Sequence, residues 1–203
     1  MKRVYAAAAL ALLCLTAAAW AEPQTFELDK PHSLIGFSIR HFFTKVEGRF
    51  QDFSGTIVMD QKNPAASSVS VSIVTASIST ANDRRDTHLK SNDFFAADSF
   101  PALTFKSTRI EPGTGSKFKV YGDLTMRGIT KPVVLDAELL GVGPIGMGGQ
   151  AMGTKAGFEA TTTVNRQDFH ISWNKTLDQG GMMLGDDVAI TLHVEANQVQ
   201  AKN

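Results

Sequence analysis

Apolar and polar residues alternate with a period of two through most of this chain, and this alternation constrains the fold more than any other feature. Eight segments show it, at 35–39, 53–59, 69–73, 103–105, 118–126, 133–139, 156–160 and 188–194. Because successive side chains of a β-strand point to opposite faces, the pattern predicts about eight strands, each with one apolar face. Turn signals such as Asn63-Pro64 and Pro112-Gly113 separate several of them and suit antiparallel neighbours. The predicted fold class is therefore all-β.

A sheet with one apolar face has to cover that face, and two architectures do so. Either a second sheet packs against it, or the sheet closes on itself into a barrel. The alternation alone leaves both open. An up-and-down barrel of about eight strands would have a lumen just wide enough for side chains, or for one slender ligand.

A dense polar block interrupts the alternation between residues 83 and 90. It contains Asp83, Arg84, Arg85, Asp86, His88 and Lys90. Such a block suits a short solvated helix, and the aromatic residues Phe94, Phe95 and Phe100 that follow provide apolar groups to anchor it.

The first 21 residues have the organisation of a secretory signal peptide. Lys2 and Arg3 precede an apolar stretch, which closes on Ala19-Trp20-Ala21. We expect cleavage after Ala21, export to the periplasm and a soluble domain over residues 22–203. Cys14 would be removed, so the exported protein could form no disulfide. Of the 20 basic and 20 acidic residues, cleavage removes two bases, which leaves a slightly acidic chain with no footprint for nucleic acid.

Four ordered blocks of residues have a spacing typical of one known family. They are Asp29, His32, Ser33, Ile35, Phe37 and His41 with Gly48, Phe50, Phe53 and Gly55; Arg85, Asp86, His88, Leu89, Ser91, Asp93, Phe94, Phe95, Pro101, Thr104, Phe105 and Ser107; Gly122, Leu124, Thr125, Gly128, Thr130, Lys131 and Pro132; and Arg166 with Asp168 and Phe169. In these residues the chain resembles the YceI family of exported, lipocalin-like polyisoprenoid-binding proteins. The resemblance implies an eight-stranded antiparallel up-and-down barrel with a short helix, a long apolar chain such as a polyprenyl lipid or quinone tail inside it, and no catalytic residues. A homodimer and a role in stress response are further expectations. Ala96 and His170 depart from the family pattern, in which an acid and a glycine are frequent, and this affects loop geometry more than the fold.

The apolar phase of the predicted strands nominates the residues that line the interior. They are Phe37, Ile39, Phe50, Leu103, Phe105, Val120, Leu124, Met126, Leu135 and Phe158. Arg40 and His41 are candidates for contact with a polar head group. The predicted mechanism is passive: the interior replaces water around a long isoprenoid or other lipid, with transient contact to a membrane.

Several other motifs indicate no chemistry. The five histidines of residues 22–203 lack the tight paired spacing of metal ligands, so no metal and no cofactor is expected. The tract 141–153 formally contains a glycine motif for dinucleotides, but Pro144 argues against the required helix, and we expect a flexible loop. Met147 and Met152, with Met182 and Met183, would then form either an adaptable apolar lip over a portal or an ordinary mobile connection.

No nucleophile elbow, zinc-protease pair or phosphate loop is present, so we expect no enzyme activity. Arg166 and Asp168 suggest an ion pair at a strand end. Two alternatives to a lipid carrier remain open. One is a stress-related structural module that binds a protein partner, and the other is a quinone-binding accessory to membrane electron transfer.

Overall fold

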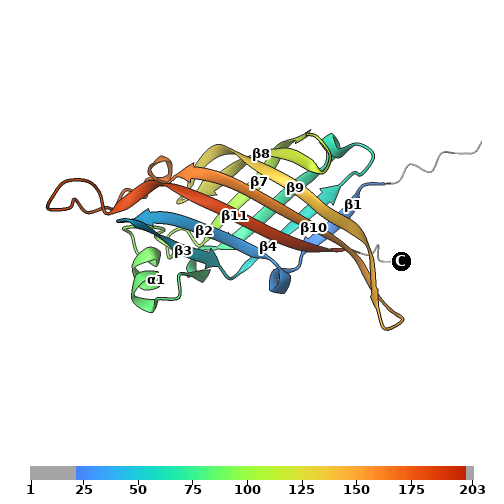
Figure 1. Ribbon diagram of the computed structural model, residues 1–203, viewed down its shortest axis with the longest axis horizontal. Coiled ribbons are helices and arrows are strands. Elements are labelled where there is room, and N and C mark those ends of the chain that lie inside the picture. Colours follow the sequence, from blue (N-terminus) through green and yellow to red (C-terminus); the bar gives the residue numbers. More distant parts are fainter. Residues whose placement is uncertain (1–21, 200–203) are drawn as a thin grey trace, which may run out of the picture.

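The computed structural model describes residues 22–199, which form an elongated antiparallel barrel with one helix at its side (Figure 1). The predicted signal peptide and Cys14 lie outside these residues. The strands are β1 (Gln24–Leu28), β2 (Leu34–His41), β3 (Thr44–Phe50), β4 (Phe53–Met59), β5 (Ser68–Val74), β6 (Ile78–Ser79), β7 (Ala102–Pro112), β8 (Lys117–Met126), β9 (Ile129–Met147), β10 (Gln150–Asn165) and β11 (Leu184–Gln198). The helix α1 spans Asp83–Lys90, and short 3₁₀ turns cover Lys30–His32, Pro64–Ala66, Thr75–Ser77 and Arg166–Phe169.

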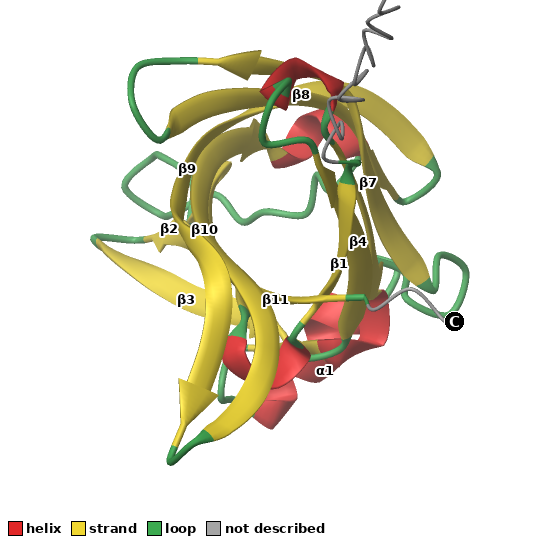
Figure 2. Cartoon of the chain, turned by 90° about the vertical axis from the view of Figure 1, so that its right-hand side faces the viewer, coloured by secondary structure: helices red, strands yellow, loops and turns green. Residues whose placement is uncertain are grey.

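Eight strands close into a ring, seen end-on in Figure 2. The order is β1-β4-β5-β7-β8-β9-β10-β11, and β1 pairs with β11 to complete it. The strands β2 and β3 continue β1 and β4 beyond short breaks, and β2 pairs with β11 next to β1. The first two strands of the barrel are therefore long and broken, and the whole is an up-and-down meander. This confirms the eight-stranded barrel and decides against two packed sheets.

The predicted alternation places one set of side chains inside the barrel. The largest core cluster includes Ile35, Phe50, Ile73, Leu103 and Phe169, all buried. A second cluster packs around Phe26, which is completely buried between β1, β4, β10 and β11. Outward positions carry polar pairs such as Lys119 with Asp136. The apolar face is thus covered by curvature of the sheet itself.

The polar block forms the predicted helix α1, which the sequence stabilises at its N-terminus. Asn82 is the N-cap, and its side chain accepts a hydrogen bond from the backbone N–H of Arg85 at 3.0 Å. Asp86 is buried and accepts hydrogen bonds from the backbone N–H and the hydroxyl of Thr80, at 2.8 and 2.5 Å. These bonds tie the helix to β6, while the buried Phe94 anchors the segment that follows.

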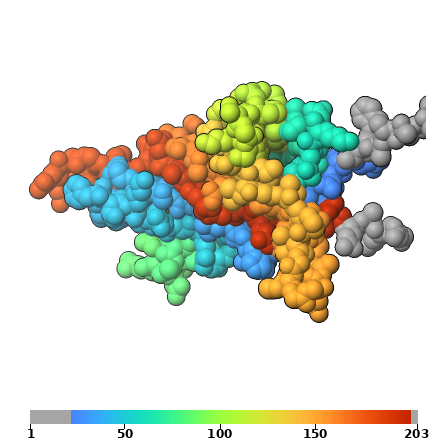
Figure 3. Space-filling view, turned by 45° about the vertical axis from the view of Figure 1, so that its right-hand side comes forward, coloured from blue at the N-terminus to red at the C-terminus, as the bar shows by residue number. Residues whose placement is uncertain are grey.

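The glycine-rich tract is not a flexible loop, and that prediction was wrong. Residues 141–147 belong to β9 and 150–153 to β10, so only Gly148 and Gly149, both with positive φ, make the turn. The ladder between the two strands continues through the tract, with a bulge between Ala151 and Thr154, and overrides the turn preference of glycine. The hairpin projects beyond the ring (Figure 3), at the end opposite the loop that holds Met182 (Figure 1). The methionines of the two segments therefore cannot form one lip.

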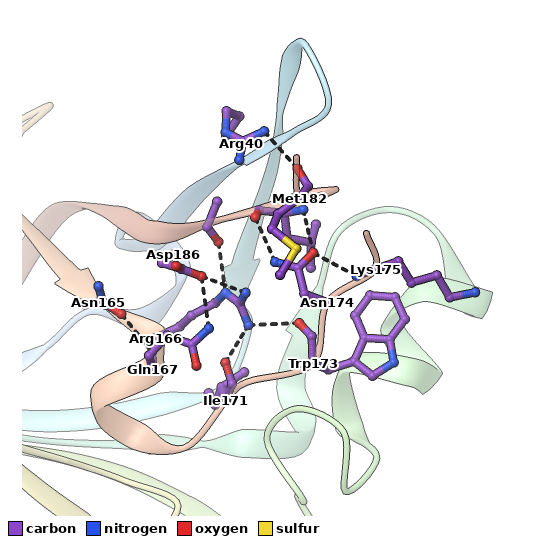
Figure 4. Close-up of polar contacts among 12 residues, drawn as sticks. Arg40, Asn165, Arg166, Gln167, Ile171, Trp173, Asn174, Lys175, Met182 and Asp186 are labelled. Atoms are coloured by element: carbon purple, nitrogen blue, oxygen red, sulfur yellow. Dashed lines mark hydrogen bonds and ion pairs between the residues drawn. The ribbon is translucent and has the colours of Figure 1, made fainter. Parts of the chain in front are cut away.

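Arg166 pairs with a different acid from the one expected. Its guanidinium is buried and donates to the carbonyl oxygens of Ile171 and Trp173, at 2.5 and 2.9 Å, and to the carboxylate of Asp186 at 2.8 Å (Figure 4). Asp168 is exposed and lies in the short 3₁₀ turn, and it forms no ion pair with Arg166 among the described residues. The partner comes from β11 rather than from the local segment, and sequence spacing does not report such a contact. Arg166 thus fixes the chain between β10 and β11.

A cluster of polar side chains stabilises the barrel at the point where the hydrogen-bonded neighbour of β11 changes from β2 to β1. The side chain of Asp29, in the break between β1 and β2, accepts hydrogen bonds from Lys155 at 3.2 Å and from Asn197 at 3.1 Å. His32 lies 3.1 Å from the same carboxylate, and Lys155 also binds Glu195 at 2.5 Å. Partial burial opposes ionisation of Asp29, but the hydrogen bonds from His32, Lys155 and Asn197 outweigh it and lower its pKa from 3.8 to about 2.

The lowered pKa predicts an acid-sensitive contribution to stability. Because the folded-state pKa lies below the unfolded one, ionised Asp29 stabilises the fold above pH 3.8, and this contribution is lost as the pH falls from 3.8 towards 2. We expect Asp29→Asn to lower the free energy of unfolding by about 1–2 kcal/mol at neutral pH. The difference from wild type should shrink near pH 2, as measured by urea unfolding. Asp168→Asn, at an exposed carboxylate, is the control, and a pH-independent loss in Asp29→Asn would contradict the assignment.

Candidate functional site

The interior of the barrel holds a continuous cavity of about 880 Å³. Every strand of the ring contributes to its wall, for example Leu28, Ile57, Val69, Leu103, Val120, Leu135, Phe158 and Val188. This volume is near the upper end of the range of about 300–1,000 Å³ that small-molecule pockets span. The cavity is therefore large enough for an extended ligand, and its wall is built mainly from aliphatic and aromatic side chains.

All ten residues nominated by alternation lie along this wall. They come from β2, β3, β7, β8, β9 and β10, and the structure brings them together across segments far apart in the sequence. Whether they contact a ligand stays a prediction. Of the two head-group candidates, His41 borders the cavity, whereas Arg40 lies outside it and donates to backbone carbonyl oxygens of Phe42 and Met182.

Two inward-facing glycines keep the lumen open. A Cβ atom on Gly48 would lie 2.3 Å from Cζ of Phe37, and one on Gly122 would lie 2.4 Å from Cζ of Phe105. Each phenylalanine ring therefore lies over the backbone of the neighbouring strand, in space that a side chain would otherwise occupy. The rings cover the wall instead of crossing the cavity, since the glycines leave room for them there.

Polar side chains that border the cavity gather towards its two ends. One end, beside α1, has His41, Thr80, Asn82, Arg84, Arg85 and His88, and the other, near the β4–β5 and β7–β8 connections, has Asp60, Gln61, Ser67, Ser116 and Lys117. Arg166 also borders the cavity near Trp173, and between the ends the wall is apolar except for Glu159 and Thr162. This arrangement suits a ligand with a long apolar body and a polar group at one end.

An aromatic group stands at the end beside α1, and sequence reasoning missed part of it. His88 packs edge-on against Trp173 and Phe94, with ring centroids 4.9 and 5.0 Å apart, and its Nε2 lies 2.8 Å from a carboxylate oxygen of Asp93. Trp173 and Phe94 are 5.3 Å apart. Trp173 lies in an irregular segment after β10, where no alternation signals its side-chain direction. Its position depends on Arg166, which binds its carbonyl oxygen.

The described residues bring together one cluster with the donors of a metal site, namely Asp29, His32 and Glu195. The ammonium group of Lys155 already lies within 3.2 Å of both carboxylates. This cation balances the acids, and the cluster lies where β11 changes its partner strand, so its geometry is that of a structural ion-pair network.

Within residues 22–199, no helix is long and apolar enough to span a bilayer.

Comparison with known proteins gives a consistent match. A model described as a YceI-like domain matches residues 26–196. Protein YceI of Escherichia coli O6:H1 is 41% identical over 149 residues, which cover 72% of this chain and 75% of the relative. The crystal structure of the Campylobacter jejuni YceI protein is 36% identical, with a TM-score of 0.66 over 85% of this chain and 97% of the other. A structure described as a polyisoprenoid binding domain from Saccharophagus degradans shares the fold, with 12% identity, a TM-score of 0.59 and coverage of 88% and 100%.

The contact between Gly48 and Phe37 predicts that a single methyl group perturbs the lumen. Gly48→Ala forces the Phe37 ring off the wall, and we expect a loss of about 1–3 kcal/mol in the free energy of unfolding. The double variant Gly48→Ala with Phe37→Leu should recover part of this loss, because the shorter side chain removes the contact with the Phe37 ring, whereas Cγ2 of Thr80 stays 2.8 Å from the added Cβ. Gly141→Ala is the matched control, since no atom lies within 4 Å of its added Cβ. Chemical denaturation of the four proteins tests this, and an equal loss in the double variant would contradict it.

Proposed function

The chain belongs to the family of YceI-like domains, and from this membership and the form of its cavity we propose that it binds a long apolar chain, a polyisoprenoid or isoprenoid quinone tail, inside the barrel. The observation that carries the proposal is the apolar cavity of about 880 Å³ with polar groups at its ends. The mechanism is sequestration: the wall replaces water around the hydrocarbon, and no covalent step takes place. The polyisoprenoid-binding domain from Saccharophagus degradans shares this fold, which is consistent with a ligand of that class.

The expected binding free energies favour a long ligand over a short one. At about 0.3 kcal/mol per heavy atom, a chain of about twenty carbons gains about 6 kcal/mol, equivalent to a Kd of tens of micromolar. A chain of about forty carbons gains about 12 kcal/mol and reaches nanomolar affinity. Retention of cargo during purification therefore requires the longer chain.

The aromatic group at the cavity end supports a second candidate, a quinone-binding accessory to membrane electron transfer. Trp173, Phe94 and His88 offer ring faces and edges where the head of the ligand would lie. A planar quinone ring packs well against such groups, whereas a simple prenyl alcohol gains little from them. Solvent extraction of gently purified protein followed by mass spectrometry separates the two, because it identifies the head group together with the chain.

Val120 offers a test of the cavity. Its side chain is buried against Phe105 and Ile110 and borders the open space. We expect Val120→Trp to keep the delipidated protein folded with near-normal stability, because the indole occupies ligand space, and to weaken binding of a long-chain prenol sharply. Lys119→Trp, on the outer face where Lys119 pairs with Asp136, should do neither. Equilibrium binding and thermal unfolding measure the two effects.

Strong destabilisation of delipidated Val120→Trp, with a melting temperature several degrees lower, would instead indicate a packed core and favour a structural module that acts through a protein partner. Normal folding with undiminished binding would remove Val120 from the ligand site.

We also propose that the protein works in the periplasm after cleavage of residues 1–21. The support is the signal-peptide organisation that ends at Ala19-Trp20-Ala21. The intact mass of the periplasmic form should correspond to a chain that begins at Glu22, and a form that retains Cys14 with attached lipid would overturn the proposal. A homodimer and a role in stress response stay predictions of the family resemblance.

A further inference from the structure

Two loops at one end of the barrel are tied into a single surface. One is the turn between β2 and β3, and the other is the segment 174–183 before β11; Figure 3 shows them side by side in light blue and red. The backbone N–H of Phe42 donates to the carbonyl oxygen of Met183 at 2.9 Å. The guanidinium of Arg40 donates to the carbonyl oxygens of Phe42 at 3.2 Å and of Met182 at 3.4 Å, the latter drawn in Figure 4. The two loops therefore hold one another in place.

Their apolar side chains point into solvent. Phe43 is fully exposed, at 102% of its reference area, while Met182 is 50% exposed and Phe42 is 39% exposed. Phe42 also has a φ of +50°, in a region that glycine and asparagine prefer and that costs a phenylalanine backbone strain. A hairpin turn has no folding need for two aromatic residues at such a cost. We call Phe42, Phe43 and Met182 the apolar tip.

Basic residues outnumber acidic ones in the two loops of the apolar tip. Arg40 and Lys45 flank the two phenylalanines in the sequence, and Lys175 lies on the neighbouring loop, which also carries Asp178. Within residues 22–199, none of these three cations lies within 4.0 Å of a carboxylate oxygen, in contrast to Lys30, Lys119 and Lys155 elsewhere on the barrel. Exposed aromatic residues beside cations that form no ion pair are complementary to an anionic phospholipid surface, which attracts the charges and accepts the rings at its headgroup boundary.

The apolar tip adjoins the end of the cavity. His41 and Met183, the chain neighbours of Phe42 and Met182, both border the cavity. An apolar chain that left a membrane beside the apolar tip would therefore meet this end of the cavity first. At the opposite end, the projecting β9–β10 hairpin exposes Met147 and Met152 but has no charged residue between 141 and 154.

We propose that the apolar tip docks the protein on an anionic phospholipid bilayer, so that the cavity end beside α1 faces the headgroups. Phe43, Phe42 and Met182 enter the interface, while Arg40, Lys45 and Lys175 contact lipid phosphates. The inference rests on the proposed function in one respect, namely that the cargo is an apolar chain drawn from a membrane. It adds the partner surface and the orientation of the barrel on it.

Flotation with lipid vesicles tests the docking site. The full exported chain is mixed with vesicles of phosphatidylcholine alone or of phosphatidylcholine with phosphatidylglycerol. We expect binding to the anionic vesicles, and about a tenfold or greater loss of partitioning in Phe43→Ser, since burial of one phenylalanine is worth at least this factor. Met147→Ser, which removes an exposed apolar side chain at the opposite end, should bind like wild type. Lys45→Glu with Lys175→Glu should lose the preference for anionic vesicles.

The outcomes separate docking from cargo binding. Phe43 is fully exposed and lies outside the cavity, so Phe43→Ser should bind a detergent-dispersed prenol as the wild type does. Wild-type protein that binds the prenol but neither kind of vesicle would overturn the docking site and leave the proposed function standing. Equal vesicle binding by wild type and Phe43→Ser, or a loss in Met147→Ser instead, would also overturn it. A specific protein partner that competes with anionic vesicles only when Phe43 is present would assign the apolar tip to that partner and contradict the lipid assignment.

Discussion

The pairing of the first and last strands is the constraint on which the rest of the structure depends. β11 pairs with β2 along most of its length and with β1 at its end, and this exchange of partners closes the ring. Without it, the one-sided strands would expose their apolar faces together with two unpaired edges. The network of Asp29, Lys155 and Glu195 lies at the point of exchange, so electrostatics reinforce the backbone bonds where one strand breaks. Curvature, lumen and cavity ends all follow from this closure.

A closed ring of eight strands does not by itself make a container, because side chains can fill it. The lumen stays open here because bulky and minimal residues are matched across neighbouring strands. Phe37 lies over Gly48 and Phe105 over Gly122, so two large rings cover the wall without crossing the cavity. The cavity thus depends on these two glycines, because each leaves free the space that a side chain would fill. Binding capacity and stability are coupled through these pairs, since the space that holds a ligand is also space the core leaves unfilled.

Local periodicity predicted the features that local sequence determines. Each of the eight alternating segments became part of one barrel strand, and the polar block became α1, because both patterns report which face of an element is wet. The alternation did not show the breaks between β1 and β2 and between β3 and β4. In β3, charged residues alternate with Val46 and Gly48, and a glycine weakens the apolar signal of the strand. The extent of β9 and β10 was missed because their ladder overrides glycine's turn preference. The ion pair of Arg166 with Asp186 and the position of Trp173 depend on contacts between segments far apart in the sequence, which the local pattern does not report. The prediction of a barrel came from the family resemblance, since the alternation alone also allowed two packed sheets.

The projecting part of the β9–β10 hairpin has a consequence for how the molecule comes apart. Pairing of β9 with β8 ends at Glu138, and pairing of β10 with β11 begins at Lys155, so residues 144–154 are held in a sheet only by pairing with one another. A two-stranded ribbon is marginally stable in water, whereas a break in the ring disrupts strands on both sides of it. The protein therefore has two cooperative units of unequal strength. We therefore expect amide hydrogens in the projecting hairpin to exchange, and proteases to cut it, without any opening of the barrel, so that neither measurement would report the stability of the part that holds the cavity.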